Sequence, residues 1–567
     1  MRYVALACDY DGTLALGGRV DEPTLAALQR ARDSGRRLLL VTGRRLDDLQ
    51  AVFPHCRLFD RIVAENGAVA HDPAERETRP LAEAPPAAFV AALRERGVAP
   101  FDAGEVIVAT WRPNEVPVLA AIRDLGLELQ VIFNKDAVMV LPPGVNKATG
   151  LAAVLAEMRL SPHNVVAVGD AENDHALLQL CECGVAVANA LPMLKDRADL
   201  VTSGDHGAGV AELVDRLLAN DLDDLASSLR RHEILLGREA NGREVCLPPY
   251  GHSVLLAGTS GGGKSTLAAA FLERLGDRGY QFCLVDPEGD FEQFEGAVVL
   301  GTGRKAPEAA EVMAVLDAPS QNAVVNLTAV PRDERPRFFE ALLPRLQELR
   351  SATGRPHWVV LDEAHHLLPS DRRTSAAIVP QRLRNTLLIT LEPSGVAREA
   401  LQSIDTLLVL GEDAAAALAD FASVSGGGDG QGPVVPALER GQAAVWLRGA
   451  PAVRPFTVEP PRAAHRRHRR KYAEGELIED EHFAFRGPEG KLNLRAENLR
   501  SFVRIAEGVD EDTWLHHFRQ GDYSRWFRQV IKDEELAREA EQVERENVAA
   551  PEGRARIRQM VEKRYSV

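Results

Sequence analysis

Residues 9–14 read Asp9-Tyr10-Asp11-Gly12-Thr13-Leu14 and directly follow an apolar run that ends at Cys8. Two carboxylates one residue apart, at the end of a predicted strand, suit covalent phosphoryl transfer to a carboxylate. We therefore expect Asp9 to be a nucleophile. Asp11 is expected to protonate the leaving alcohol, a step worth roughly 10² to 10⁴ in rate.

Further polar residues follow apolar runs in the same part of the chain. Thr42 can hold a phosphate oxygen, and Lys147 can neutralise charge on the phosphoryl group. Asp170 and Asp174 offer the oxygen ligands that Mg²⁺ prefers. From residue 1 to about 215, short apolar runs alternate with amphipathic stretches, a pattern that predicts a parallel sheet flanked by helices. Residues at the carboxyl ends of such strands can converge on one site.

These motifs, in this order, resemble the haloacid dehalogenase (HAD) superfamily, type IIB, with its Cof-like and sucrose-phosphate-phosphatase-like members. The resemblance covers about residues 1–215 and implies a Rossmann-like core with an α/β cap at about 82–143. It implies a phospho-aspartate at Asp9, with Mg²⁺ held by Asp9, the main-chain carbonyl of Asp11, and Asp170. Asp174 would support the metal site.

The resemblance also implies a small phosphomonoester substrate, such as a sugar phosphate or phosphoglycolate. The cap would shape the leaving-group site. Arg112 and Asn114 are polar candidates there, and their alternative role as ordinary surface loop residues is at least as well supported. Asn173 would help to order the loop that carries Asp170.

A second phosphate motif, Gly258-Thr259-Ser260-Gly261-Gly262-Gly263-Lys264-Ser265, lies between a predicted strand at 253–257 and a predicted helix at 264–272. Glycines and a helix N-terminus let backbone N–H groups surround phosphates. Lys264 is expected to reach the β and γ oxygens of ATP, and Ser265 to bind Mg²⁺. The expected nucleotide-binding residues are Gly258, Gly261, Gly263, Lys264, Ser265 and Thr266.

Asp362 and Glu363 follow the apolar run 358–361, so Asp362 can hold Mg²⁺ and Glu363 can polarise the attacking water. A buried strand with an acidic helix cap is the weaker alternative, given the upstream P-loop. With Gly251-His252 and the stretch 284–291, these motifs resemble the HerA/FtsK-like ATPases of the additional-strand P-loop class, over about 233–457. Many such relatives are ring-forming DNA or protein pumps that use an arginine finger. The candidates here are Arg382, Arg384 and Arg398.

One departure from that family weakens the case for a motor. Relatives commonly place a glutamine sensor after the strand that corresponds to 388–390, whereas this chain has Leu391 and Glu392. The formal net charge of −16 also argues against a nucleic-acid partner, because phosphate backbones bind to positive surface. A basic run at 462–471 is either a solvated linker or a contact for phosphate or nucleic acid.

The length of 567 residues predicts three to four domains. We expect an α/β multidomain chain with a P-loop NTPase α/β domain and a mainly α C-terminal domain. The aromatic residues of the tail favour a small helical core over a recognition surface. With no apolar run of about 18 residues, a cytoplasmic protein with no membrane contact is expected. The expected units are 1–215 (phosphatase-like), 216–232 (linker helix), 233–460 (ATPase-like), 461–475 (basic linker) and 476–567 (helical, role unknown).

Three functions follow from these motifs. The favoured one is a Mg²⁺-dependent phosphatase that an ATP-binding, ATP-hydrolysing domain regulates or assembles, with homo-oligomer formation through that domain. The second is a DNA or protein translocase with an accessory phosphatase. The third is a nucleotide-sensing module with little ATP turnover. The complete phosphatase motif set and the altered sensor position favour the first.

Overall fold

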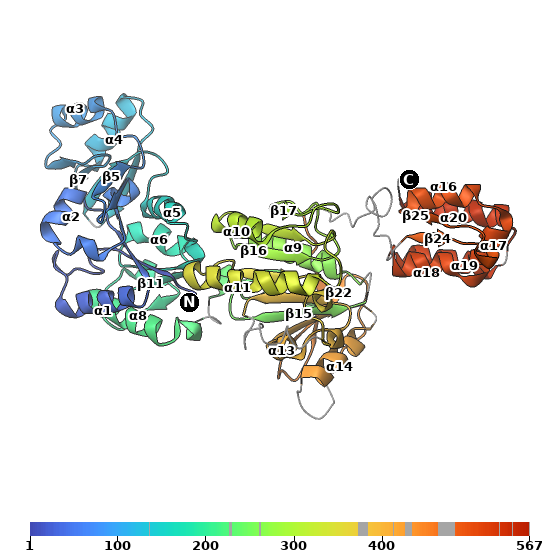
Figure 1. Cartoon of the computed structure of the whole chain (residues 1–567). Coiled ribbons are helices and arrows are strands. Elements are labelled where there is room, and N and C mark those ends of the chain that lie inside the picture. The colour runs from blue at the N-terminus through green and yellow to red at the C-terminus, as the bar shows by residue number, and fades with distance from the viewer. Residues whose placement is uncertain are drawn as a thin grey trace.

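The computed structural model describes residues 1–134, 136–225, 229–259, 262–371, 384–411, 413–425, 434–462, 482–531, 533–546 and 548–565. Figure 1 shows an N-terminal domain (blue to green), a middle domain (yellow-green to orange) and a smaller C-terminal domain (red). In the described ranges, no helix is both long and apolar enough to cross a bilayer.

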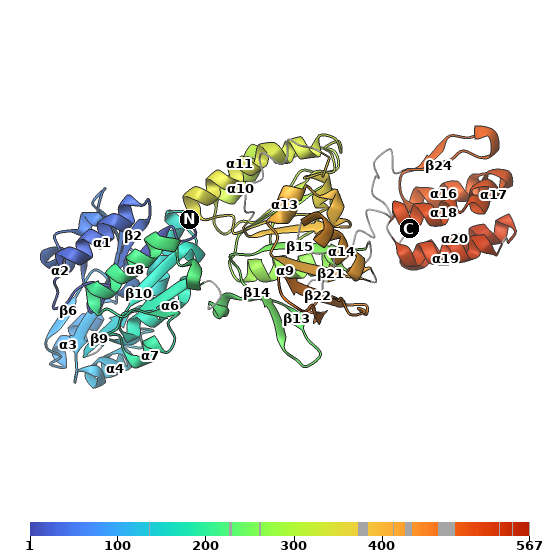
Figure 2. The ribbon, with the colours of Figure 1, turned by 90° about the horizontal axis from the view of Figure 1, so that it is seen from below.

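The N-terminal domain is built on an eight-stranded sheet of order β12-β11-β10-β1-β2-β3-β4-β5. Strand β1 (Ala5–Cys8) lies at its centre, parallel to β10 (Val165–Gly169) and β2 (Arg37–Val41). All residues of β1 and β10 are buried, because helices cover both faces of the sheet (Figure 2). The Rossmann-like core predicted from the sequence is therefore present. Its other elements are α1 (Glu22–Asp33), α2 (Leu46–Val52), β3 (Arg61–Ala64), β4 (Val69–Asp72), β5 (Glu77–Pro80), α5 (Lys147–Glu157), α6 (His175–Leu180), β11 (Cys183–Ala186), α7 (Pro192–Lys195), β12 (Leu200–Val201) and α8 (His206–Asn220).

A second, four-stranded antiparallel sheet of order β6-β7-β9-β8 interrupts this core in sequence and forms the cap. Helices α3 and α4 pack on one face of it, around Phe89, Val118 and Val140. Its other face meets the core, where Met139 and Leu141 join a cluster with core residues. The elements are α3 (Ala87–Glu95), β6 (Phe101–Ala103), β7 (Val108–Trp111), α4 (Glu115–Asp124), β8 (Gln130–Asn134) and β9 (Ala137–Leu141).

The predicted linker helix at 216–232 differs from the structure. The helix at this position, α8, begins at His206, packs into the N-terminal core and ends at Asn220. Asp221 then adopts a left-handed conformation, with φ 56°. Its carboxylate accepts hydrogen bonds from the Arg2 backbone N–H at 2.5 Å and from Arg36 at 2.9 Å. These contacts end the helix and hold the chain against the first domain.

The middle domain contains an eleven-stranded sheet of order β14-β13-β23-β22-β21-β15-β20-β19-β16-β18-β17. Strand β20 (Thr386–Thr390) lies between the P-loop strand β15 (Ser253–Gly258) and β19 (Trp358–Leu361), parallel to both. This is the additional strand that the sequence resemblance implied. The other elements are β13 (Ile234–Arg238), β14 (Glu244–Leu247), α9 (Lys264–Asp277), β16 (Phe282–Asp286), β17 (Val298–Leu300), α10 (Ala309–Asp317), β18 (Ala323–Asn326), α11 (Arg335–Thr353), α13 (Arg398–Gln402), β21 (Thr406–Leu410), α14 (Ala414–Ser425), β22 (Gln442–Leu447) and β23 (Arg454–Val458).

The C-terminal domain is mainly helical, as predicted, and its aromatic residues form a core. Trp514, Tyr523 and Phe527 are buried together, with the Trp514 and Tyr523 rings stacked at 4.4 Å. The sequence did not indicate the short hairpin that packs on these helices. The elements are β24 (Phe483–Phe485), β25 (Leu494–Ala496), α16 (Leu499–Gly508), α17 (Glu511–Gln520), α18 (Asp522–Gln529), α19 (Glu534–Arg545) and α20 (Ala550–Arg564).

A buried polar network, which we call the joint, connects the N-terminal and middle domains. Its centre is Glu182, fully buried, which accepts hydrogen bonds from Arg2 at 2.7 Å and from the Tyr280 hydroxyl at 2.6 Å. His163 Nδ1 lies 2.8 Å from the same carboxylate, and the His163 ring stacks on Tyr280 at 3.8 Å. Around this centre, His357 Nε2 lies 3.1 Å from the Asn164 amide oxygen. Since Tyr280 and His357 belong to the middle domain, the two domains share one hydrogen-bonded core.

The joint lies at the amino ends of parallel strands in both sheets. Residues 163–164 and 182 precede β10 and β11, and Tyr280 and His357 precede β16 and β19. The carboxyl ends of these strands therefore point away from the joint in both domains. These strands have four or five residues and span roughly 13–17 Å each, so each carboxyl edge lies on the order of 15 Å from the joint.

We expect Glu182→Gln to destabilise the joined domains by about 3–5 kcal/mol, because it leaves a buried arginine without its counter-ion. Tyr280→Phe removes one hydrogen bond from the same charged carboxylate and should cost about 1.5–3 kcal/mol. Denaturant unfolding of both variants checks this order. Equal losses in the two variants would contradict the central role of Glu182.

The stabilisation from Glu182 has a defined pH dependence. Burial alone would raise the pKa of Glu182, but the His163 hydrogen bond and the charge of Arg2 hold it well below the ordinary value. A depressed folded-state pKa means that the stabilisation is complete above about pH 4.3, the unfolded value, and is lost as the pH falls below it.

Candidate active sites

The first site lies at the carboxyl edge of the N-terminal sheet. Asp9 follows β1, Asp170 follows β10, and both are at least 96 % buried, with exposed fractions of 4 % and 3 %. Oxygen atoms of Asp9, Asp170 and Asp174 lie within 4.8 Å of one another. Lys147, the first residue of α5, donates to Asp9 at 2.5 Å and to Asp174 at 2.7 Å. The structure thus brings together four of the residues selected from the sequence.

The charges of the buried side chains in this cluster do not balance. Burial, followed by the negative charge of Asp174, raises the pKa of Asp9 to about 8, although Lys147 opposes that shift. Burial alone would lower the pKa of Lys147, but the charges of Asp174 and Asp9 outweigh it and raise that pKa. Three carboxylates around one ammonium leave excess negative charge in a buried place, and a further cation there would lower the pKa of Asp9 again.

The two carboxylate oxygens of Asp174 are both used to hold neighbouring groups. Oδ1 accepts from Lys147, and Oδ2 accepts from the backbone N–H groups of Asp170 and Ala171 at 3.0 Å each. Asp174 therefore fixes the loop that carries Asp170. Asn173 donates from Nδ2 to Asn66 Oδ1 at 3.0 Å, which ties the same loop to the turn after β3.

Thr42 and Asp11 lie beside this cluster in different settings. Thr42 is fully buried, and its hydroxyl accepts from the Arg44 backbone N–H at 3.1 Å. Asp11 is more exposed and forms a bidentate pair with Arg44, at 2.6 and 2.7 Å. No sequence motif indicated that Arg44 pairs with Asp11. Gly12 keeps the loop close to Asp170, because a Cβ there would lie 2.3 Å from Asp170 Oδ2.

The second site lies at the carboxyl edge of the middle sheet. Gly258 ends β15 with φ 154°, and a Cβ there would lie 2.3 Å from the Leu410 carbonyl oxygen, so this position requires glycine. Gly263, with φ 104°, leads into α9, which begins at Lys264. The Lys264 ammonium donates to the carbonyls of Gly258 and Thr259 at 2.8 and 3.1 Å. Ser265 and Thr266 follow in the first turn of α9, whereas Gly261 lies outside the described residues.

Acidic side chains gather at the ends of β16 and β19. Asp362, 2 % exposed, has a pKa raised well above the ordinary value by burial and then by the charges of Glu363 and Asp286. Burial and the charge of Asp290 raise the pKa of Asp286 to about 7. Asp286 also accepts from the Gly289 and Phe291 backbone N–H groups at 2.7 and 2.8 Å, so it shapes its own turn.

The strand end at the altered sensor position carries Thr390, which is fully buried. Its hydroxyl lies 3.2 Å from His365 Nδ1, and the same nitrogen lies 3.5 Å from Glu363 Oε2. His365 therefore stands between Glu363 and the strand end. Of the candidate arginine fingers, Arg384 pairs with Asp223 at 2.8 Å and Arg398 begins α13, while Arg382 and most of the basic run at 462–471 lie outside the described residues.

Comparison with known proteins identifies both domains. Residues 6–99 and 125–214 match the haloacid dehalogenase-like hydrolase family. A phosphoglycolate phosphatase from Methanothermobacter thermautotrophicus is 34 % identical over 222 residues, which are 38 % of this chain and 98 % of that protein. Through its N-terminal domain, the chain belongs to the haloacid dehalogenase-like hydrolase family. A phosphoglycolate phosphatase from Halorubrum lacusprofundi is 32 % identical, over 36 % of this chain and 93 % of that protein.

Solved structures and the second domain complete the comparison. A haloacid dehalogenase-like hydrolase from Bacteroides thetaiotaomicron is 20 % identical and covers 38 % of this chain and 99 % of its own, with a TM-score of 0.34. Residues 235–390 match the AAA ATPase domain family. The chain therefore combines a HAD-type phosphatase domain with an AAA-type ATPase domain. This match does not name the HerA/FtsK type that the sequence resembles.

The two cap candidates of the HAD domain have different surroundings. Asn114 donates from Nδ2 to the Thr110 hydroxyl at 3.0 Å and to the Ala99 carbonyl at 3.3 Å, so it braces the cap itself. The Arg112 guanidinium stacks over the Phe133 ring at 5.2 Å. In contrast, Met139 of β9 reaches the phosphoryl site, because its Cε lies 3.2 Å from where a Cβ on Gly43 would stand.

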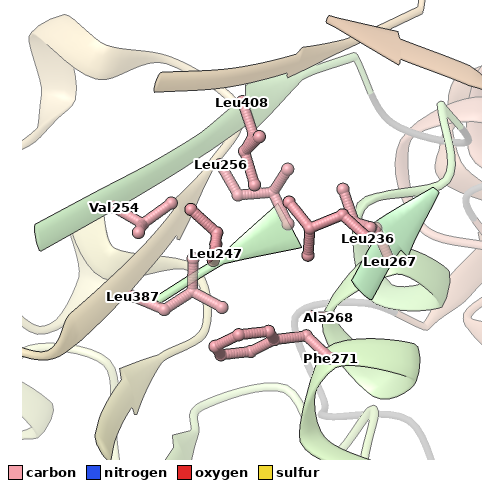
Figure 3. Close-up of a pocket in the computed structure, with 9 residues that line it drawn as sticks. All are labelled: Leu236, Leu247, Val254, Leu256, Leu267, Ala268, Phe271, Leu387 and Leu408. Atoms are coloured by element: carbon pink, nitrogen blue, oxygen red, sulfur yellow. The ribbon is translucent and has the colours of Figure 1, made fainter. Parts of the chain in front are cut away.

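A small cavity in the ATPase domain lies behind the P-loop helix and apart from the acidic groups. Figure 3 shows that only apolar side chains line it, from the sheet, from β13 and β14, and from α9. Such a cavity stays dry and offers no partner to a phosphate. It therefore belongs to the core that supports α9. The lining residues are Leu236, Leu247, Val254, Leu256, Leu267, Ala268, Phe271, Leu387 and Leu408.

Proposed function

We propose that the HAD domain hydrolyses small phosphomonoesters through a phospho-aspartate on Asp9. The observation that supports this most is the buried contact of Asp9 with Lys147, beside Asp170 and Asp174. Lys147 holds one Asp9 oxygen and leaves the other to approach phosphorus. Because the ammonium lies 2.5 Å from the attacking carboxylate, it can also offset negative charge on the phosphoryl group.

The proposed reaction has two halves, and Asp11 transfers a proton in each of them. The Asp9 carboxylate forms a bond to phosphorus as the bond to the leaving oxygen breaks, and Asp11 gives that oxygen a proton. Asp11 then takes a proton from the water that attacks the phospho-aspartate. This step releases phosphate, returns Asp9 to a carboxylate and returns Asp11 to its protonated form. The Thr42 hydroxyl holds a phosphoryl oxygen. In the structure both Asp11 oxygens accept from Arg44, so this pair has to open before Asp11 carries a proton.

The donor set fits Mg²⁺. The carboxylates of Asp9 and Asp170, with the main-chain carbonyl of Asp11, would hold it, and Asp174 would keep the loop of Asp170 in place. The uncompensated negative charge of the cluster and the close approach that Gly12 allows both suit a small hard cation. When bound, Mg²⁺ supplies neutralisation of the charge on the phosphoryl oxygens.

The substrate class that we propose is a phosphoglycolate or sugar phosphate. The sequence identity of 34 % and 32 % to two phosphoglycolate phosphatases, over nearly their whole length, supports phosphoglycolate as the substrate. The cap closes over the site with Met139 near Gly43, which suits a small leaving group.

We further infer that the ATPase domain binds and hydrolyses ATP and acts on the phosphatase through the joint. Each site lies at the carboxyl ends of strands whose amino ends meet at the joint. The hydrogen bonds around Glu182 form a continuous route between strands of the two sheets. Regulation through this route is consistent with one shared core, whereas a DNA motor has no support beyond the sequence resemblance.

A phosphomonoester panel with and without Mg²⁺, ATP and duplex DNA tests this proposal. We expect Mg²⁺-dependent release of phosphate from phosphoglycolate or a sugar phosphate, and a change in that rate when ATP is added. If DNA stimulates ATP hydrolysis and the phosphatase rate does not change when ATP is added, the result would instead support a translocase. Nucleotide binding without turnover would support a sensor.

A further inference from the structure

A strained turn follows β3 and touches both the cap and the phosphoryl site. Glu65 and Asn66 adopt left-handed conformations, with φ 50° and 55°, and are 2 % and 0 % exposed. Two consecutive non-glycine residues in this region cost free energy, and such strain gathers at functional sites when the surrounding contacts impose it. The residues that make these contacts indicate what the turn does.

The Glu65 side chain reaches into the cap. Its Oε1 accepts from the backbone N–H of Glu105 at 2.9 Å, and its Oε2 accepts from those of Val106 and Ile107 at 2.8 Å each. These three residues lead directly into β7 of the cap. Gly104 permits the contact, since a Cβ there would lie 2.4 Å from Oε1. A buried carboxylate that accepts three backbone hydrogen bonds is a strong, directional attachment.

The backbone of the same turn holds the loop after β2. The Glu65 N–H donates to the Arg44 carbonyl at 2.9 Å, and the Asn66 N–H donates to the Thr42 carbonyl at 3.0 Å. The residue proposed to hold a phosphoryl oxygen and the partner of Asp11 are thus both fixed by this turn.

Two further contacts reach the remaining groups of the phosphoryl site. Asn66 Oδ1 accepts from Asn173 Nδ2 at 3.0 Å, in the loop between Asp170 and Asp174. Gly67 packs on the start of α5, where a Cβ would lie 1.9 Å from the Asn146 carbonyl oxygen and 3.0 Å from the Lys147 nitrogen. A shift of the turn would therefore move the supports of Lys147 and of the Asp170 loop together.

We propose that Glu65 is a positioning residue that latches the cap in its closed place and couples that closure to the phosphoryl site. When the cap stands open, the carboxylate is hydrated and the three N–H groups of residues 105–107 lose their acceptor. Closure restores these bonds and lets the turn settle against Thr42, Asn173 and α5. The inference rests on the phosphatase activity of this domain.

The test compares Glu65→Gln with Gly104→Ala. In Glu65→Gln, the side-chain amide N–H groups face the backbone N–H groups of residues 105–107. In Gly104→Ala, the added methyl group crowds the Glu65 carboxylate from the cap side. With p-nitrophenyl phosphate and Mg²⁺ as probe, we expect both variants to lower kcat/KM by about 10- to 100-fold, because small misplacements of reacting groups are costly. Glu95→Gln, on the exposed end of α3, is the matched control and should behave as wild type.

Amide hydrogen exchange provides a readout that does not depend on activity. We expect faster exchange at residues 105–107 in both variants, with the strands of the core protected as in wild type. Unchanged exchange at 105–107 in Glu65→Gln would overturn the latch, even if the protein hydrolysed no phosphomonoester. Faster exchange throughout the domain would also overturn it, since that result assigns Glu65 to general stability. If exchange changes locally but kcat/KM stays at the wild-type value, the coupling to the phosphoryl site is wrong.

Discussion

Asp9→Asn is expected to lower phosphomonoester hydrolysis by roughly 10³-fold or more, since an amide cannot form the acyl phosphate on which the proposed reaction depends. The substitution preserves size, and Lys147 keeps its 2.7 Å contact with Asp174. Burial and like charge raise the pKa of Asp9, so its ionised form is costly in the fold. The melting temperature of the variant should therefore equal or exceed that of wild type.

The matched control for this prediction is Asp215→Asn. Asp215 lies on the surface of α8 and pairs with Arg30 at 2.7 Å, an exposed ion pair worth at most about 1 kcal/mol. Phosphate release by this variant should match wild type. Hydrolysis by Asp9→Asn at more than about a tenth of the wild-type rate would exclude Asp9 as the nucleophile.

Lys264→Ala should reduce ATP hydrolysis by about 10²-fold or more, because the ammonium at the start of α9 lies where the β and γ phosphates would bind. Without ATP, its phosphatase rate should equal that of wild type, since the two sites lie in different domains and on different sheets. With ATP, the change in phosphatase rate seen in wild type should disappear. Coupled measurement of ADP and phosphate release tests all three expectations.

Lys305→Ala is the control for that prediction, because Lys305 is exposed and pairs with Glu311 at 3.1 Å, away from the P-loop. It should leave both activities unchanged. Undiminished ATP hydrolysis in Lys264→Ala would contradict the P-loop assignment. Loss of phosphatase activity in Lys264→Ala without ATP would contradict the separation of the two sites.

Much of the first site follows from sequence order and one rule of parallel sheets. Asp9 and Asp170 each follow an apolar strand, and parallel neighbours end at the same edge, so their convergence was predictable. Lys147 lies at the start of a helix, so the strand-end rule does not apply to it. Its role was indicated by the sequence motif around it. The rule that parallel strands end at the same edge of a sheet also predicted that Asp362 lies near the P-loop.

The contacts that the sequence did not reveal join residues far apart in the chain. In the sequence, nothing distinguishes Glu65-Asn66-Gly67 from an ordinary turn. Its role depends on the cap loop about forty residues later, which folds over it. Glu182 carries no local signal, because its partners lie 180 residues before it and 98 residues after it. Likewise, the apolar spacing after residue 213 predicted a longer helix. It could not show that the helix ends where Asp221 contacts Arg2 and Arg36. Local patterns cannot specify such pairings.

The most direct test of the proposed mechanism is mass spectrometry of the protein quenched in acid during turnover of phosphoglycolate or p-nitrophenyl phosphate with Mg²⁺. An acyl phosphate survives acid long enough to be mapped to a peptide. The account predicts one phosphoryl group on the peptide that contains Asp9, and none on that peptide in Asp9→Asn. Steady hydrolysis with no phosphoryl group on Asp9, or with the group on another residue, would contradict it.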